Sequence, residues 1–360
     1  NRDFFIGWQN FLWQNILPNN YLRVGTYIAL IVALIINYLY LIKYWPKKNI
    51  FSDKKILTIL LIIIFIILIS YNALSHDVFN YIFNARMLIK YSADPHHIAA
   101  INFAYDPWLR FMHNIHTPAP YGQAWTIISI IPYLLGFEKF LLTWLGFKAF
   151  AFLGMMLGYL FLKKLLNKNQ EKNFKLTLLF LNPLILIETL SNAHNDWWMM
   201  WPVLASFFLI KKFNQEKKKK FIGLLLVIVL MSFSIFSKFA SILTIPFLIY
   251  YLFSKQIDDF KIFKNIFLII LIYFIDLYFW DLISITLFLP LFTNRSQRFL
   301  TWYLIWPMTF LPLLKSKWWR NTLLIFSVSA LFSYLPEIIY LPWLYFDQTV
   351  PNALLLKQLL

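Results

Sequence analysis

Residues 56–69 read ILTILLIIIFIILI, a run that is apolar at every position except Thr58. Residues 27–41 and 221–236 are similarly apolar, and several further runs of this kind follow along the chain. A helix needs about 20 residues to cross the hydrocarbon core of a bilayer. Helices and closed barrels are the structures that satisfy their backbone groups in that core. These repeated apolar runs therefore indicate an all-α, polytopic membrane protein.

The composition supports this class. The chain of 360 residues is 60% hydrophobic and 14% charged, whereas a soluble domain carries roughly a quarter charged residues. The formal net charge is +17, but the basic residues form short clusters between apolar runs, as membrane topology demands. We therefore expect the bilayer, and no nucleic acid, as a partner. The chain has no cysteine, which excludes disulfide and thiolate chemistry.

We expect one integral membrane domain, residues 1–360, with about 10–12 transmembrane helices. An aromatic, amide-rich segment at 1–20 predicts an interfacial helix. The chain begins at Asn1 and ends within an apolar run, so we expect both termini to be truncated. The spans are expected near 22–42, 56–73, 138–162, 175–190, 197–210, 221–236, 239–253, 264–281, 301–314 and 320–335.

Lysine and arginine predict the orientation of these spans. They concentrate in the connections at 43–55, 163–175, 211–220, 254–264 and 315–320, which the positive-inside rule places in the cytoplasm. The loop at 74–120 and the turn at 191–196 then face outward. Residues 121–135 are too short to cross, because a span needs about 20 residues, and predict a helix in the outer leaflet.

The outward loop concentrates the titratable groups. From Ser75 it reads SHDVFNYIFNARMLIKY, and the loop holds five of the six histidines together with Asp77, Asp94 and Asp106. Such a concentration in a membrane protein favours a functional site over a solvated connection. If Ser75 caps a helix that runs to Tyr91, one face of that helix carries a polar stripe at the membrane surface, made of Asp77, Asn80, Tyr81, Asn84 and Tyr91. The alternative is that Asp77 only stabilises the start of its own helix.

Two further groups lie on the predicted outer side. Residues 188–198 read ETLSNAHNDWW and bring Glu188, His194 and Asp196 close together. The second group is cationic and consists of Lys238, Arg295 and Arg298. Three cations suit a lipid-linked phosphate, but Lys238 could equally snorkel to the headgroups, and Asp276 and Asp281 are alternative partners. The histidines form no HxxxH or HExxH pattern, so we expect no metal site.

Six segments in order resemble one known family. They are DVFNYIFNARM, DPWLRFMH, YGQAW, LNPLILIETLSNAHND, SKFASILTIPFLI and WYLIWPM. Over about residues 70–315 they resemble the polyprenyl-phosphate-dependent mannosyltransferases of the GT-C superfamily, and among these the bacterial α-mannopyranosyltransferases. The resemblance implies a GT-C-like bundle with an outer pocket, covered by a long first loop that carries membrane-parallel helices. It also implies a sugar donor carried on a polyprenyl phosphate.

The matching positions suggest site residues. The loop acid of the family falls on Asp77, its turn histidine and acid fall on His194 and Asp196, and its lysine falls on Lys238. The chain departs from the family pattern at Gln123, where proline is usual, and at Ala193, where glycine is usual. Many relatives carry a paired acid in the first loop, whereas here His76 precedes the single Asp77, which further disfavours a metal.

We therefore expect an inverting membrane glycosyltransferase at the outer face of the plasma membrane. It would move a hexose, by the resemblance mannose, from a polyprenyl-phosphate sugar to a hydroxyl of a lipid or glycan acceptor, without a cofactor. The alternatives are another GT-C activity, such as an oligosaccharide ligase or protein O-mannosyltransferase, and a lipid or solute transporter. A transporter should show symmetric halves and broken helices, and no repeat is visible in the sequence.

Asp77, His194 and Asp196 are the expected catalytic residues. Asp77 is the expected base, because an unperturbed aspartate has a pKa of about 3.9 and a helix start does not raise it, and His194 is the alternative. The expected substrate-binding residues are Asn80, Tyr81, Asn84, Tyr121, Lys238, Arg295, Arg298, Trp302 and Tyr303.

Overall fold

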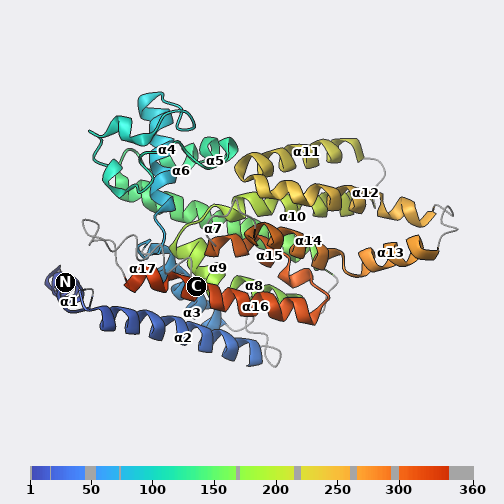
Figure 1. Ribbon diagram of the computed structural model, residues 1–360, viewed down its shortest axis with the longest axis horizontal. Helices are drawn as coiled ribbons and strands as arrows, with labels where there is room; N and C mark the ends of the chain where they lie inside the picture. The colour runs from blue at the N-terminus through green and yellow to red at the C-terminus, as the bar shows by residue number, and fades with distance from the viewer. Residues whose placement is uncertain are drawn as a thin grey trace.

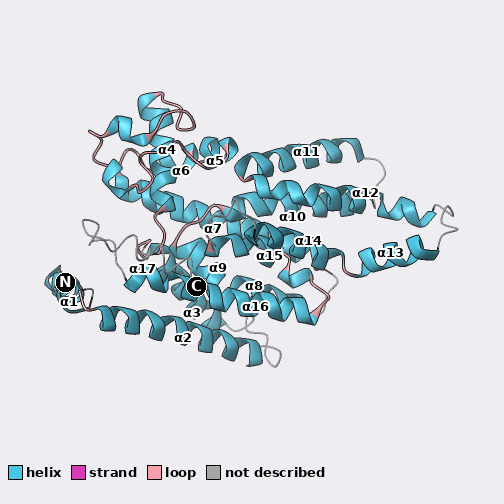
Figure 2. Cartoon of the chain, viewed as in Figure 1, coloured by secondary structure: helices cyan, strands magenta, loops and turns pink. Residues whose placement is uncertain are grey.

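The computed structural model describes residues 2–16, 18–44, 54–72, 74–167, 171–214, 220–259, 266–292 and 300–339. Within these ranges the chain forms helices and loops and no strand, which confirms the all-α prediction (Figures 1 and 2). The principal helices are α1 (Arg2–Phe11), α2 (Asn20–Tyr44), α3 (Lys54–Ile69), α4 (Asp77–Tyr91), α5 (Gln123–Ile128), α6 (Ile130–Leu134), α7 (Phe140–Leu165), α8 (Lys172–Phe180), α9 (Pro183–Leu186), α10 (Asp196–Phe213), α11 (Lys220–Ser237), α12 (Ile245–Asp259), α13 (Ile266–Leu277), α14 (Phe279–Phe288), α15 (Ile305–Met308), α16 (Lys317–Leu331) and α17 (Leu335–Ile339).

Several of these helices are suited to a bilayer. In the described part of the chain, α2, α7 and the segment Lys317–Ile339 are each long and apolar enough to cross, and two bent helix pairs raise this number to five. Four more apolar segments are shorter, among them Phe221–Ser237 and Phe239–Phe253. The chain is therefore a polytopic membrane protein. By length and composition the described helices do not reach the expected 10–12 spans, because the shorter segments fall below the length of a full crossing.

The bundle is organised around α10. Most long helices run roughly along the longest axis of the molecule, and α4, α5 and α6 form a lobe near one end, at the upper left of Figure 1. Helix α10 packs against α7 and α11, and Trp197 and Trp198 lie against two glycines of α7, Gly154 and Gly158. A side chain at either glycine would collide with an indole ring, so this G-x-x-x-G spacing lets α10 approach α7 closely.

Two of the expected spans are broken. The segment predicted as 175–190 forms α8 and α9, which meet at an angle of 59°. The bend lies at Asn182 and Pro183, where proline cannot donate a backbone hydrogen bond and the Asn182 side chain caps α9 by accepting from Leu184 N at 3.0 Å. The chain then continues through the π-helix η6 (Ile187–Ser191). The segment predicted as 264–281 forms α13 and α14, which meet at 74°.

Asp276 and Asp281, on either side of this second bend, do not form the ion pairs with Lys238 that the sequence offered as an alternative. Asp281 accepts hydrogen bonds from the backbone nitrogens of Lys315 and Ser316, both at 3.0 Å, and Asp276 accepts one from the Tyr250 hydroxyl at 2.6 Å. The cation Lys238 pairs with another acid, Asp196. Asp276 and Asp281 are therefore not the partners of Lys238.

The predicted span at 301–314 is also not one helix. It consists of the short helices η10 (Thr301–Leu304), α15 and η11 (Leu311–Leu313), and most of their side chains are buried. Pro307 and Pro312 interrupt the helical hydrogen bonding.

Helix α4 differs from its prediction. It begins at Asp77 with His76 as the N-cap residue, and the Ser75 hydroxyl accepts from Asp77 N at only 3.4 Å, so Ser75 is not the cap. The side chains from Val78 to Met87 are all buried. The expected helix with one face on the membrane surface is therefore a core helix of the lobe, covered by α5, α6 and α7.

Candidate functional site

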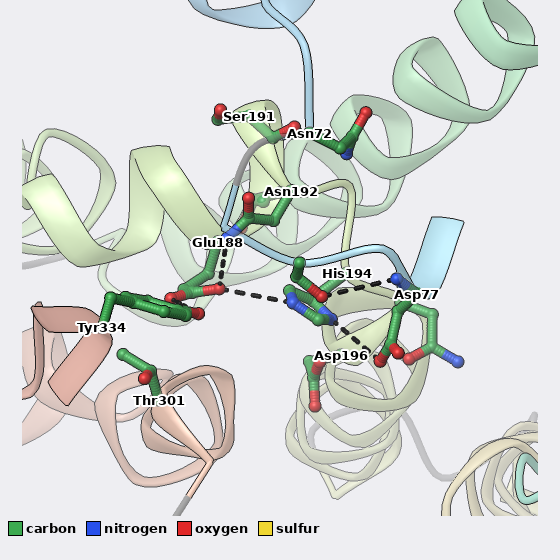
Figure 3. Close-up of polar contacts among 12 residues, drawn as sticks. Asn72, Asp77, Glu188, Ser191, Asn192, His194, Asp196, Thr301 and Tyr334 are labelled. Atoms are coloured by element: carbon green, nitrogen blue, oxygen red, sulfur yellow. Dashed lines mark hydrogen bonds and ion pairs between the residues drawn. The ribbon is translucent and has the colours of Figure 1, made fainter. Parts of the chain in front are cut away.

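The turn between η6 and α10 places the second group of acids and histidine. The backbone nitrogens of Asn192 and His194 donate to the carbonyls of Ile187 and Glu188, at 2.8 and 3.0 Å. Ala193 has φ of +58°, a conformation that glycine adopts without strain. This tight turn folds the His194 side chain back over Glu188 (Figure 3).

His194 lies between two carboxylates. Its Nδ1 is 3.6 Å from Oδ2 of Asp77, and its Nε2 is 3.4 Å from Oε2 of Glu188 (Figure 3). Its ring stacks on Trp302 with centroids 4.1 Å apart. The side chain is fully buried, yet within the described residues neither ring nitrogen makes a hydrogen bond. Buried polar atoms are normally paired, so the imidazole is held in position without being satisfied.

Glu188 is anchored from both sides. The Tyr334 hydroxyl donates to its Oε1 at 2.8 Å, and the Asn192 amide donates to its Oε2 at 2.9 Å. Its side chain is fully buried. Glu188 is therefore a fixed carboxyl group behind His194, and its burial keeps it out of reach of a substrate.

Asp77 is placed differently. Its side chain is 20% exposed, whereas those of Glu188 and Asp196 are 0% exposed. Burial raises the pKa of Asp77 to about 6, and the positive charge of Lys238 opposes that rise. The expectation of an unperturbed pKa was therefore wrong, because it considered only the helix start and not the surrounding core. Asp77 remains mainly ionised at neutral pH.

His194 is neutral over the same range. Burial lowers the pKa of the imidazole well below its ordinary value, and the charge of Lys238 lowers it further. A neutral imidazole carries one N–H and one acceptor nitrogen. It can therefore donate a hydrogen bond through only one of its two ring nitrogens.

Lys238 forms the positive side of the site. Its Nζ lies 2.7 Å from Oδ1 of Asp196, which also accepts a hydrogen bond from the Trp306 indole. The ammonium is 5.4 Å from the ring centre of Tyr303, and the side chain is 14% exposed. Lys238 is therefore a largely buried cation with a fixed partner rather than a lysine that reaches for the headgroups.

Tyr121, just before α5, and two residues of α4 complete the candidate site. The Asn80 amide donates to Asp77 at 3.4 Å and to the Tyr121 hydroxyl at 3.2 Å. The Tyr81 hydroxyl donates to Asn195 at 3.3 Å and so ties α4 to the turn. Asn84 is buried on the same helix, and its amide nitrogen finds no hydrogen-bond partner in the described part of the chain.

Most of the site residues named from the sequence thus lie around one centre. They are Asp77, Asn80, Tyr81, Tyr121, His194, Asp196, Lys238, Trp302 and Tyr303. Asn84 lies further along α4, and Arg295 and Arg298 lie outside the described residues. Among the described residues no group of three or more His, Cys, Asp or Glu is arranged to hold a metal ion.

Sequence reasoning missed the residues that support the centre. Trp306 belongs to the quoted WYLIWPM segment, so its presence was visible although its contact with Asp196 was not. Tyr334 gave no signal, because it lies in an apolar run 146 positions from its partner Glu188.

Lys148 was also missed, although a lysine inside an apolar run is itself a signal. It lies in α7 with a fully buried side chain. Its ammonium donates to the carbonyls of Ser191 and Ser70, at 2.6 and 2.8 Å. The Ser191 carbonyl also accepts from the Asn72 amide at 2.7 Å. Lys148 and Asn72 therefore hold the end of η6 immediately before the turn that carries His194.

The described geometry offers an accessible carboxylate, a neutral imidazole and a partly shielded cation within one group. Such a set can take a proton from a hydroxyl and stabilise an anionic leaving group.

Comparison with known proteins agrees with this chemistry. A family model described as "Alpha-(1->6)-mannopyranosyltransferase, N-terminal domain" matches residues 8–254, which is more than half of the chain. No curated protein and no solved structure matches the chain. The family match confirms the resemblance that the sequence segments indicated.

Proposed function

Because the chain belongs to the alpha-(1->6)-mannopyranosyltransferase family, we propose that it transfers mannose from a polyprenyl phosphate to a hydroxyl of a lipid or glycan acceptor. The reaction would occur at the outer face of the plasma membrane. The family consists of glycosyltransferases, which favours this activity over a transporter even though the structure contains two bent helix pairs of the kind expected of transporters.

The observation that carries the proposal is the unequal access to the three carboxylates. Asp77 is 20% exposed, whereas Glu188 and Asp196 are closed off by their partners. A general base must come within hydrogen-bond distance of the proton that it accepts. Asp77 is therefore the proposed base, and its raised pKa of about 6 makes it a better proton acceptor than an ordinary aspartate.

The proposed reaction is a single displacement with inversion. An Asp77 oxygen accepts the proton of the acceptor hydroxyl while the oxygen of that hydroxyl forms a bond to the anomeric carbon. The bond from the anomeric carbon to the phosphate oxygen breaks, and its electron pair leaves on the polyprenyl phosphate. His194 orients Asp77, from which its Nδ1 is 3.6 Å away.

Lys238 is proposed to stabilise the departing phosphate. A lysine ammonium has three donors, and the contact with Asp196 uses one of them. A phosphate oxygen that approaches past Tyr303 would accept hydrogen bonds from the remaining N–H groups of Lys238. Asn80, Tyr81, Tyr121 and Trp302 are proposed to contact the sugar or to shape its pocket, because they surround Asp77 and His194. The proposed reaction uses no cofactor and no metal ion.

The test is a reconstituted transfer reaction. Purified protein receives polyprenyl-phosphate mannose and a membrane glycolipid or mannoside acceptor. The measurements are the release of free polyprenyl phosphate and the anomeric configuration of the product relative to the donor. Transfer with inversion is the expected result. Retained configuration would contradict the single displacement, and the absence of transfer with every acceptor would contradict the proposed activity.

A further inference from the structure

A second polar site lies in the same lobe, at the end of α4 opposite to Asp77. It is a cavity of about 390 Å³, and its polar lining consists of Ser92, Asp94, His96, Gln123 and Thr126. It lies between the last turn of α4, the turn at 92–96 and the first turns of α5, two helices that are neighbours in Figure 1. Neither Asp77 nor His194 lines it. Its volume is within the range of sites that bind small molecules.

The lining suits an uncharged, hydroxyl-rich ligand. The residues that line the cavity carry two hydroxyls, an amide, an imidazole and a carboxylate, together with apolar side chains such as Leu88. This combination matches a hexose, which presents hydroxyl groups at its edges and C–H groups on its faces. No lysine or arginine lines the cavity, which disfavours a phosphate. The backbone N–H of His96 and the His97 ring lower the pKa of Asp94, so this residue offers a carboxylate that accepts hydrogen bonds.

The walls of the cavity are fixed by hydrogen bonds. Asp94 accepts from His96 N at 2.9 Å and from Ile98 N, through its backbone carbonyl, at 2.9 Å. The His96 ring lies 3.0 Å from the Thr126 hydroxyl and joins the turn to α5. The backbone of Ala119 donates to the Pro95 carbonyl at 2.7 Å. The site is therefore built before a ligand arrives, which reduces the entropic cost of binding.

The segment that begins α5 contacts both the candidate centre and the cavity. Tyr121 contacts Asn80 beside Asp77, and Gln123, two residues later, lines the cavity. Asp77 and Leu88 are 11 positions apart on α4, which corresponds to about 16 Å along the helix axis. An acceptor must therefore contain several hexose units to contact both Asp77 and the cavity.

We propose that this cavity binds a neutral hexose unit of the acceptor glycan, beyond the unit that receives the transferred sugar. The inference rests on the proposed function, because it makes the cavity an acceptor subsite of the same enzyme. It assigns Gln123 as a residue that determines preference for acceptor length.

The experiment compares Gln123→Ala with Asn102→Ala in the full chain. Gln123 is exposed at the first residue of α5, and Asn102 is an exposed amide in η4 (Ala100–Phe103) of the same lobe that does not line the cavity. The acceptors are synthetic α-(1→6)-linked mannosides of one to four units with polyprenyl-phosphate mannose as donor. We expect kcat/KM of the unaltered protein to rise with acceptor length. Loss of one or two hydrogen bonds should lower the value for the longest acceptor by about 3- to 30-fold in Gln123→Ala, with no change for the shortest acceptor or in Asn102→Ala.

A binding measurement without donor separates this inference from the proposed function. Saturation-transfer NMR of the longest mannoside should show contact with the unaltered protein and with Asn102→Ala, and a weakened signal with Gln123→Ala. An unchanged signal and an unchanged length profile in Gln123→Ala would overturn the subsite. If no variant transfers mannose, the proposed function fails, and the binding measurement alone still decides whether the cavity holds a glycan.

Discussion

The buried carboxylate of Asp106 and the centre around His194 differ in how completely their polar atoms are hydrogen-bonded. Asp106 accepts hydrogen bonds from Arg86 at 2.5 Å, from Tyr91 at 2.6 Å and from the backbone of Trp108 at 2.9 Å. The centre around His194 has instead two ring nitrogens and one Asp196 oxygen without a hydrogen bond in the described residues. A satisfied polar cluster stabilises one conformation, whereas an unsatisfied one has capacity left for a ligand.

The two groups also differ in how they hold their protons. Although burial opposes it, hydrogen bonds from Arg86, Tyr91 and Trp108 lower the pKa of Asp106. Burial raises the pKa of Asp77 to about 6. The comparison supports a structural role for Asp106 and agrees with the proposed chemical role of Asp77, although both were noticed in the sequence as acids of one loop.

The largest expected effect is on stability and comes from breaking the satisfied pair. Both members of the Arg86–Asp106 ion pair are buried, so Arg86→Met leaves an unpaired buried carboxylate and should cost about 3–5 kcal/mol of unfolding free energy. Thermal unfolding in detergent measures this loss, and Arg110→Met, which removes an exposed arginine of the same lobe, is the control. Activity per folded molecule should be retained. A specific loss of catalysis at full stability would place Arg86 in the chemistry and remove the distinction.

The second effect is on catalysis and comes from Asp77→Asn. This change keeps the shape of the side chain but removes the proton acceptor, and turnover should fall at least ~100-fold while donor affinity changes far less. Single-turnover rates measure the chemical step. Glu138→Gln makes the same chemical change at an exposed position of the lobe and should leave the rate unaltered. If Asp77→Asn stays active while His194→Ala is inactive, His194 is the base and Asp77 only begins its helix.

Lys238→Ala should have a smaller effect, directed at the donor. Losing a charged hydrogen bond to a phosphate costs about 1.5–3 kcal/mol, equivalent to roughly tenfold to more than a hundredfold in kcat/KM for the donor. The measurement is the donor dependence of the rate, accompanied by thermal unfolding because Asp196 loses its ion-pair partner. Lys139→Ala, an exposed lysine at the start of α7, is the matched control. Donor dependence equal to that of the unaltered protein would reduce Lys238 to a structural cation.

The smallest expected effect near neutral pH is on the pH dependence of the transfer rate. With a pKa of about 6 for Asp77, the rate should be near its plateau at pH 7 and should fall about tenfold for each unit below 6 as the base becomes protonated. The two groups should also affect stability in opposite directions. Ionisation of Asp77 costs stability as the pH rises from about 4, the ordinary aspartate value, to about 6, whereas the stability from Asp106 is lost as the pH falls from about 4 through its lowered pKa. A rate that stays constant from pH 7 to pH 4 would exclude Asp77 as the base.

Sequence reasoning was most successful where chemistry and motif order agreed. Asp77, His194, Asp196 and Lys238 were chosen because acids, histidine and lysine are conspicuous between apolar runs, and they lie together in the structure. The all-α membrane class followed directly from the apolar runs. These features depend on residue type along the chain, which a sequence displays.

The remaining features depend on contacts that a sequence does not display. Trp306 and Tyr334 reach acids that are 110 and 146 positions away, and the burial that raises the Asp77 pKa arises only in the folded structure. The bend between α13 and α14 carries no proline, so the apolar pattern reads as one span. By contrast, the bend at Pro183 could have been predicted from the proline alone.

The joint at Gly122 links the two ends of the proposed reaction. Its backbone nitrogen donates to the Ser237 carbonyl at 3.2 Å, and a side chain at this position would overlap the Phe236 carbonyl. The next residue after Ser237 is Lys238, and the residue before Gly122 is Tyr121, so one backbone contact sets the spacing between the cation and the entrance to α5. A displacement of the end of α11 would therefore move the start of α5 as well. In the proposed reaction this contact would couple the binding of the donor phosphate to the alignment of the acceptor, and the lack of a side chain at Gly122 permits the contact.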